Sequence, residues 1–174
     1  MQTSRRSFLK IGVLGALTLA AGGAIYRAMQ APAVSGPFVL DGAARAVLAA
    51  LIPSMVGPAV PTEPAARAAC VDDMLVRVEA AIHGLPRATQ KEVQDLFGLL
   101  ALGPARRFLA GIPDSWEQAT PAQVDAFLDS WRSHRFDLLT SAYQALHDLI
   151  LGPWYANPAN WAAIGYPGPI KELS

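Results

Sequence analysis

The sequence predicts an all-α protein, and three observations support this class. Apolar residues recur at helical spacing (i, i+3, i+4, i+7) in one segment after another. Prolines, glycines and capping residues fall between these segments, where helices begin and end. No segment shows the sustained alternation of apolar and polar residues that is typical of a half-buried strand. We therefore expect a small helical domain of about five to six helices.

The first 33 residues are organised like an export signal and precede that domain. A basic start is followed by an apolar stretch, residues 11–29, and by the small-residue segment Ala31-Pro32-Ala33. The start matches the twin-arginine pattern at Arg5, Arg6, Phe8, Leu9 and Lys10. This pattern addresses proteins that cross the membrane after folding. We expect a signal helix that directs the chain to the periplasm through the twin-arginine translocase; the alternative is an ordinary membrane anchor.

Cleavage of this signal decides whether the protein stays attached to the membrane. Ala31 and Ala33 are the small residues that a cleavage site requires, but Pro32 lies between them. The apolar stretch has 19 residues and four glycines, which places it near the lower end of the roughly 17–25 residues that a span needs. An uncut signal would tether the protein to the outer face of the inner membrane. The sequence leaves both outcomes open.

The charge of the remaining chain argues against a nucleic-acid partner. After residue 33 the sequence has ten Lys and Arg against fourteen Asp and Glu. Phosphate backbones are bound by concentrated basic residues, and Arg106-Arg107 is the only adjacent basic pair in this part of the sequence. A single acidic domain without a basic cluster is therefore expected.

The first two predicted helices are defined by caps and prolines. Asp41 precedes a helix that we expect to end before Pro53, because proline lacks the N–H that a helix interior uses. A proline-rich loop follows. Pro64 then suits the first turn of a helix over residues 64–83, whose apolar stripe faces one side.

The remaining predicted helices complete the domain. A helix within 85–103 has apolar residues at i, i+3, i+4 and i+7, and a short helix follows at 104–111. Thr120 is a capping residue with proline at the next position. After it, 121–135 and 136–152 are two long helices or one kinked helix. The helical domain is thus expected over residues 34–151.

The C-terminal residues 152–174 differ from the helices in composition. They contain four prolines and three glycines, so we expect an extended tail. An aromatic ring buries roughly 150–250 Å² when it is covered. The rings of this tail are therefore expected to be covered by the chain's own helices or by a partner protein. The partner hypothesis assigns the interface to Trp154, Tyr155, Trp161, Tyr166 and Pro167.

Cys70 is the only cysteine, which excludes a disulfide within the chain. Its place in the apolar stripe of residues 64–83 favours a small, buried side chain. The alternative is a disulfide with a cysteine of a partner subunit, since the periplasm is oxidising.

The residues that often carry chemistry form no recognisable catalytic, cofactor-binding or metal-binding set. His83, His134 and His147 do not have the helical spacing of a zinc site. Asp125 and Asp129 are expected to lie on a solvated, ion-paired face of a helix. A chain without a cofactor that carries the address of folded cargo suggests a partner that does contain one.

Over nearly its whole length the chain resembles the small subunits of flavin-dependent membrane dehydrogenases, the gluconate 2-dehydrogenase subunit 3 group. The segments that carry the resemblance are SRRSFLK at 4–10, LAALIPSMVG at 48–57, VEAAIHGLPRATQKEVQDLFGLLAL at 78–102 and ILGPWYANPANWAAIGYPGP at 150–169. The most specific piece is Gly165-Tyr166-Pro167-Gly168-Pro169.

The resemblance implies a large partner of the glucose–methanol–choline oxidoreductase type, which holds FAD and lacks an export signal. It also implies a cytochrome c subunit with haem c in many such complexes. The expected function is a non-catalytic accessory subunit that binds, stabilises and co-exports a dehydrogenase for an alcohol or a sugar. The alternatives are a stand-alone periplasmic binding protein and a membrane-tethered adaptor for another enzyme.

Overall fold

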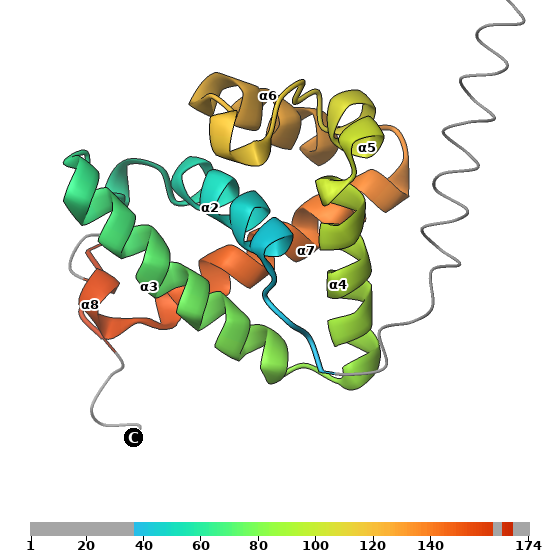
Figure 1. The fold of residues 1–174 in the computed structure, drawn as a ribbon. Coiled ribbons are helices and arrows are strands. Elements are labelled where there is room, and N and C mark those ends of the chain that lie inside the picture. Colours follow the sequence, from blue (N-terminus) through green and yellow to red (C-terminus); the bar gives the residue numbers. More distant parts are fainter. Residues whose placement is uncertain (1–36, 162–164, 169–174) are drawn as a thin grey trace, which may run out of the picture.

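The structure is a computed structural model that describes residues 37–161 and 165–168. These residues form helices and no strand, which confirms the all-α class (Figure 1). The export-signal residues Arg5, Arg6, Phe8, Leu9 and Lys10 lie outside the described residues. The described elements are the α-helices α2 (Gly42–Val56), α3 (Pro64–His83), α4 (Arg87–Ala101), α5 (Gly103–Leu109), α6 (Pro121–Arg132), α7 (Asp137–Ala156) and α8 (Pro158–Trp161), and the 3-10 turns η1 (Gly57–Ala59) and η2 (Trp116–Gln118).

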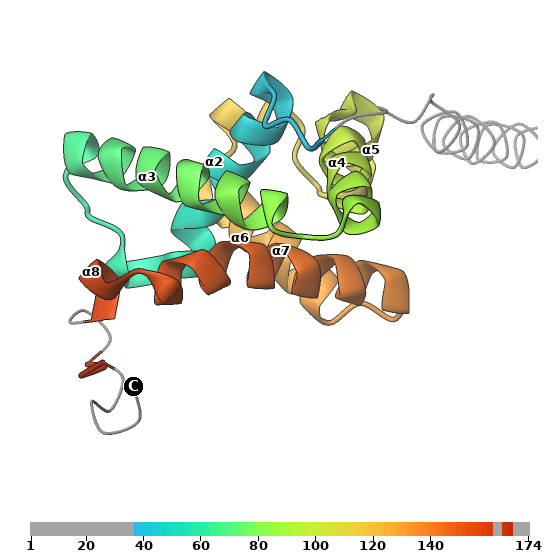
Figure 2. The same cartoon turned by 90° about the horizontal axis from the view of Figure 1, so that it is seen from below.

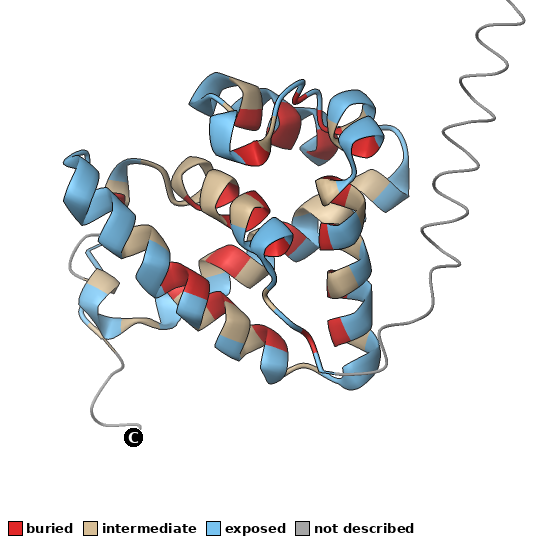
Figure 3. Ribbon diagram, in the orientation of Figure 1, coloured by how far each residue is buried: buried red, intermediate tan, exposed pale blue. Residues whose placement is uncertain are grey.

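Helix α2 lies at the centre of the domain and contacts α3, α4, α6 and α7 (Figures 1 and 2). Asp41 caps its start, because the carboxylate accepts the N–H of Ala44 at 2.8 Å. Its buried side chains repeat at helical spacing and form the middle of the core, as Figure 3 shows in red: Ala44, Val47, Leu48, Leu51 and Ile52. In the described part of the chain, Gly42–Ala59 is the one stretch long and apolar enough to cross a membrane. The domain buries 28% of this stretch.

Helix α2 continues past Pro53, so the predicted end at that proline is wrong. It ends at Val56, and the next residue, Gly57, has a φ of 70°, a conformation that favours glycine. Proline removes one hydrogen bond from the ladder, but Leu51 and Ile52 are fully buried just before it. Packing of this apolar turn against the rest of the core keeps the chain helical.

Helix α3 begins at Pro64, as the sequence predicts. The carboxylate of Glu63 accepts the N–H groups of Ala65 and Ala66, which lowers the pKa of Glu63. The helix packs along α7 through the buried face formed by Met74, Leu75, Val78 and Ile82.

Helices α6 and α7 are separate, which settles the choice between two helices and one kinked helix. The capping box at Thr120 opens α6, with both reciprocal hydrogen bonds to Gln123 present. Between the two helices, Nδ1 of His134 accepts the N–H of Phe136 at 3.1 Å. This bond turns the chain before α7 starts.

Helix α7 continues across the boundary that the sequence places at residue 152. Residues 152–156 are its last turn, although Pro153 lies inside it. Leu146, Ile150 and Trp154 follow one another at four-residue spacing on its buried face. Trp154 is only 5% exposed. Burial of this large ring against the core explains why the helix persists through proline and glycine.

Two tryptophans fix the short α5 region to the rest of the domain. The indole N–H of Trp116 donates to the carbonyl of Leu100 at 2.8 Å, at the end of α4. That of Trp131 donates to the carbonyl of Leu109 at 2.9 Å, at the end of α5. Both rings are buried and pack edge-to-face on Phe127. These bonds satisfy carbonyls that helix ends leave without a partner.

Candidate functional site

The described C-terminal residues fold into a compact structure on the end of α7. Its centre is the Trp161 ring, whose indole N–H donates to the carbonyl of Tyr155 at 2.8 Å. The N–H of Tyr166 returns to the carbonyl of Trp161 at 2.9 Å. The Trp161 and Tyr166 rings meet edge-to-face with centroids 5.2 Å apart. We call Tyr155, Trp161 and Tyr166 the aromatic cap.

Exposure divides the five predicted interface residues into two groups. Trp154 lies in the domain's own core, and the carbonyl of this residue also accepts the side-chain amide of Asn160 at 2.9 Å. Tyr155 is 50% exposed and Tyr166 is 46% exposed. Pro167 is exposed, and Trp161 is half-buried. The structure therefore pairs the Trp161 and Tyr166 rings and bonds the Trp161 indole to the Tyr155 backbone, whereas the Trp154 ring lies in the core.

Two glycines explain the Gly-Tyr-Pro-Gly sequence of the cap. Gly165 has a φ of 69° and Gly168 a φ of 95°, which side-chain-bearing residues rarely adopt. A Cβ atom on Gly168 would lie 3.1 Å from Cζ3 of Trp161. The absence of a side chain at Gly168 lets the backbone pack against the indole, and this holds Tyr166 beside it.

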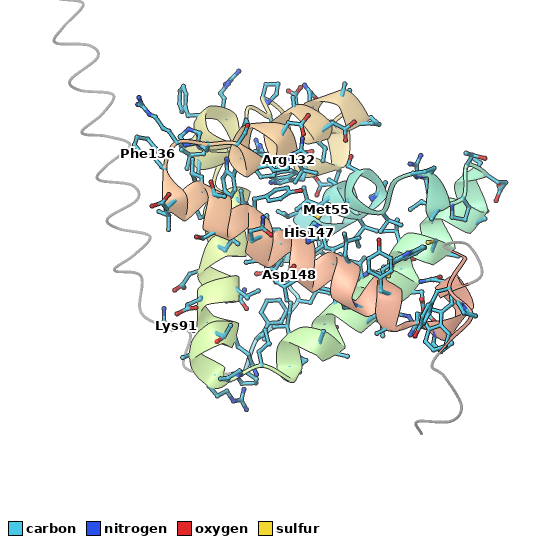
Figure 4. The ribbon with its side chains drawn as sticks, turned by 180° about the vertical axis from the view of Figure 1, so that it is seen from behind. Met55, Lys91, Arg132, Phe136, His147 and Asp148 are labelled. Carbon is cyan, nitrogen blue, oxygen red and sulfur yellow. The ribbon has the colours of Figure 1, made fainter. Side chains whose placement is uncertain are left out.

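A second exposed aromatic group lies at the opposite end of α7. Phe136 is 56% exposed and Leu138 is 78% exposed. The Arg135 guanidinium lies over the Phe136 ring, 4.8 Å from its centroid. Figure 4 shows Phe136 on the edge of the molecule, away from His147 and Asp148. On α5, Phe108 is 72% exposed. The composition of the sequence did not indicate any of these residues.

Cys70 is partly exposed on α3 and packs against the core. Burial, aided by the negative charge of Asp73, raises the pKa of its thiol. A raised pKa lowers the thiolate fraction at neutral pH, so the thiol reacts slowly with electrophiles. Because Cys70 is partly exposed, the hypothesis that it forms a disulfide with a partner subunit stays a prediction to be tested.

The charged residues singled out in the sequence form surface pairs. Arg132 contacts Asp129 at 2.9 Å between Nη2 and Oδ1, on an exposed face of α6. His147 and Asp148 lie on α7, and Nδ1 of the first is 3.1 Å from Oδ1 of the second (Figure 4). This contact joins two adjacent side chains at the surface of the helix. Within residues 37–161 and 165–168, no three His, Cys, Asp or Glu side chains gather as a metal site.

A mostly apolar groove of about 650 Å³ lies between α3, α4 and α7. Its walls include Ala81, Leu85, Val93 and Leu149, and its floor reaches Pro153 near the aromatic cap. Arg77 also lines this groove, and its hydrogen bond to Asp73 raises the pKa of Arg77. The polar residues of this mostly apolar lining are Arg77, Thr89 and Asp148.

The fold and this surface define a small all-helical protein that presents ordered aromatic side chains at one end. Comparisons of the chain with protein-family models, curated proteins and solved structures find no significant match.

Proposed function

We propose that this chain is a non-catalytic accessory subunit that binds a large FAD-dependent alcohol or sugar dehydrogenase and is exported with it. The twin-arginine pattern of Arg5 and Arg6 would carry the folded pair to the periplasm. The chain's own sequence shows no cofactor site that would require folding before export. The partner would therefore be the cargo that requires this route. FAD would reside in the partner, and haem c in a cytochrome subunit where one is present.

The aromatic cap is the observation that carries the proposal. Tyr155 and Tyr166 are about half exposed, yet their backbones are fixed by hydrogen bonds through Trp161. Tyrosine and tryptophan provide large contact areas at interfaces and have few rotatable bonds to immobilise. A rigid aromatic surface therefore favours binding to another protein, because little conformational entropy is lost.

Co-export is tested with the double variant Arg5→Lys/Arg6→Lys. A candidate FAD-dependent dehydrogenase from the same genome is co-expressed, and FAD fluorescence and dye-linked dehydrogenase activity are measured in periplasmic extracts. We expect both to be retained in the cytoplasm with the double variant and exported with Arg27→Lys, a matched control outside the pattern. Normal periplasmic activity with the double variant contradicts co-export.

The same experiment separates the alternatives. A stand-alone binding protein would leave the flavoprotein's location unchanged in every variant and would not co-purify with it. An adaptor for another enzyme would co-purify with a different protein that contains no FAD. Either result removes the dehydrogenase from the proposal.

A further inference from the structure

Exposed apolar side chains gather at the end of the molecule opposite the aromatic cap. Phe108, in the last turn of α5, and Phe136 and Leu138, at the start of α7, each expose more than half of their surface. Figures 1 and 2 both place α5 and the start of α7 at the end of the molecule away from α8. The hydrogen bond from the Trp131 indole to the Leu109 carbonyl joins the end of α5 to the end of α6, just before α7.

Positive charge is concentrated at the same end of an acidic domain. Residues 102–109 and 132–139 contain four arginines and one acidic residue. The rest of the sequence after residue 33 has six Lys and Arg against thirteen Asp and Glu. Arg132 is paired with a carboxylate of α6. Within the described residues, no ion pair joins Arg107 or Arg135 to a carboxylate, so both guanidinium groups are available to an anion.

Arginine and apolar side chains are next to each other on this surface. Arg107 directly precedes Phe108, and Arg135 directly precedes Phe136. The Arg135 guanidinium lies over the Phe136 ring, 4.8 Å from its centroid, and Figure 4 shows this phenylalanine on the edge of the molecule. Surfaces that bind the membrane interface have this composition, because apolar side chains enter the acyl boundary while cationic groups stay at the depth of the phosphates.

We infer that this end of the domain docks on the surface of a bilayer that contains anionic phospholipid. Phe108, Phe136 and Leu138 enter the boundary between headgroups and acyl chains, and Arg107 and Arg135 bind lipid phosphates. These side chains extend from the ends of separate helices, and a fluid bilayer accepts protruding side chains without a complementary shape. A second copy of the chain is a poorer occupant, because two such faces would bring arginines together.

The aromatic cap stays accessible in this orientation, since it lies at the other end of α7. The inference goes beyond the proposed function and requires neither the flavoprotein nor a retained N-terminal segment. A domain docked in this way would hold a protein partner on the side away from the lipid.

The test uses the full chain with Cys70→Ser and an environment-sensitive fluorophore at Ser141→Cys, an exposed position one turn after Leu138. A matched label at the exposed Ala68→Cys lies near the start of α3, which Figures 1 and 2 place away from α5. Vesicles contain phosphatidylcholine alone or with phosphatidylglycerol. Apolar residues 11–29 would hold every variant on a vesicle, so the environment of the label is measured and not total binding. We expect a blue shift and several-fold brighter emission at residue 141 only, and only with phosphatidylglycerol.

Charge variants test the role of the arginines. Arg107→Gln combined with Arg135→Gln should lower the ratio of inserted to free label about thirtyfold, the effect of two charges at an anionic surface. Arg67→Gln combined with Arg87→Gln removes the same charge from exposed positions outside this face and should leave the emission unchanged. Circular dichroism checks each fold. A measurement without charge variants raises NaCl to about 1 M, which shortens the Debye length to about 3 Å and should also reverse the shift.

Three results overturn the inference. Equal emission changes at residues 141 and 68 mean that this end of the domain is not the one that meets lipid. A response that is independent of phosphatidylglycerol, of salt and of the two arginines means that they do not bind phosphates. A change at residue 141 with a purified flavoprotein, but none with vesicles, assigns this face to a protein partner. A response at residue 141 alone that requires phosphatidylglycerol and both arginines supports it.

Discussion

The side chain of Gln90 joins Phe38 to the α3–α4 turn: its Oε1 accepts the Phe38 N–H at 3.1 Å, across 52 residues of sequence. Gln90 is 4% exposed and is the one buried polar or charged residue in the described part of the chain. Both ends of its amide are used, because the nitrogen donates to two carbonyls of the turn. A buried amide that satisfies three backbone groups stabilises a unique arrangement of the segments it joins.

Substitution Gln90→Ala should destabilise the domain by about 2–3 kcal/mol, since it leaves buried backbone groups without a partner. The matched control is Gln94→Ala, which removes one hydrogen bond at an exposed site. We expect the control to cost about 1 kcal/mol or less. Urea denaturation followed by circular dichroism measures both values. Equal losses for the two variants would show that burial of Gln90 contributes nothing.

Substitution Thr120→Ala should destabilise the domain by about 1 kcal/mol through loss of the α6 capping box. The Thr120 hydroxyl accepts the N–H of Gln123 at 3.3 Å, and the Gln123 side chain accepts the N–H of Thr120 at 2.8 Å. Thr120→Ser keeps the hydroxyl and should stay within about 0.5 kcal/mol of the wild type. The midpoint of thermal unfolding reports both. An alanine variant as stable as the serine variant is incompatible with a working cap.

Alanine substitution of the buried Trp154 and of the exposed Tyr155 and Tyr166 should have different effects on stability and on binding. Trp154→Ala should cost about 3–5 kcal/mol of stability, because it empties a core position. Tyr155→Ala and Tyr166→Ala remove exposed rings and should change stability by less than about 1 kcal/mol. Under the proposed function, each should weaken flavoprotein binding about thirtyfold, the effect of a ~2 kcal/mol interface anchor. Phe108→Ala, an exposed ring elsewhere, is the control.

Isothermal titration calorimetry separates the outcomes for the tail. Unchanged affinity for both tyrosine variants removes the cap from the interface, even if the complex itself forms. A comparable loss with Phe108→Ala would indicate that the partner contacts a broad apolar surface, not the cap.

Alkylation of Cys70 by iodoacetamide should be slow at pH 8 and accelerate as the pH rises. Burial and the charge of Asp73 raise the pKa of this thiol, so less thiolate is present than in the unfolded chain. Asp73→Asn should speed the reaction in the folded protein, with Asp72→Asn as the matched control. Mass spectrometry follows the modification. A rate independent of residue 73 would rule out its electrostatic effect.

The raised pKa of Cys70 also makes the free energy of unfolding depend on pH. The folded state holds the Cys70 proton more tightly than the unfolded state. The contribution of this protonation to the free energy of unfolding is therefore fully present below the ordinary thiol pKa of about 8.5. It is lost as the pH rises through the higher folded pKa. Urea midpoints measured from neutral to alkaline pH should therefore fall more for the wild type than for Cys70→Ser. An identical fall in both would contradict the linkage.

Part of the candidate site was accessible from composition. Aromatic residues near the C-terminus, between prolines and glycines, indicate that rings there must be covered, and the chain does cover Trp154. Composition does not separate Trp154 from Tyr155. Adjacent residues on a helix point about 100° apart, so one enters the core while its neighbour faces solvent. Only the packing of α7 decides which is which.

The sequence by itself determined the helical class and most helix starts, because apolar spacing, Thr120 and Pro64 act within a few residues. The tertiary structure decided where helices end when prolines intervene, since the cost of Pro53 or Pro153 is offset by burial against distant helices. It also decided the partner of Gln90, which lies 52 residues away. Local patterns specify elements, whereas buried contacts between distant residues depend on how those elements pack in three dimensions.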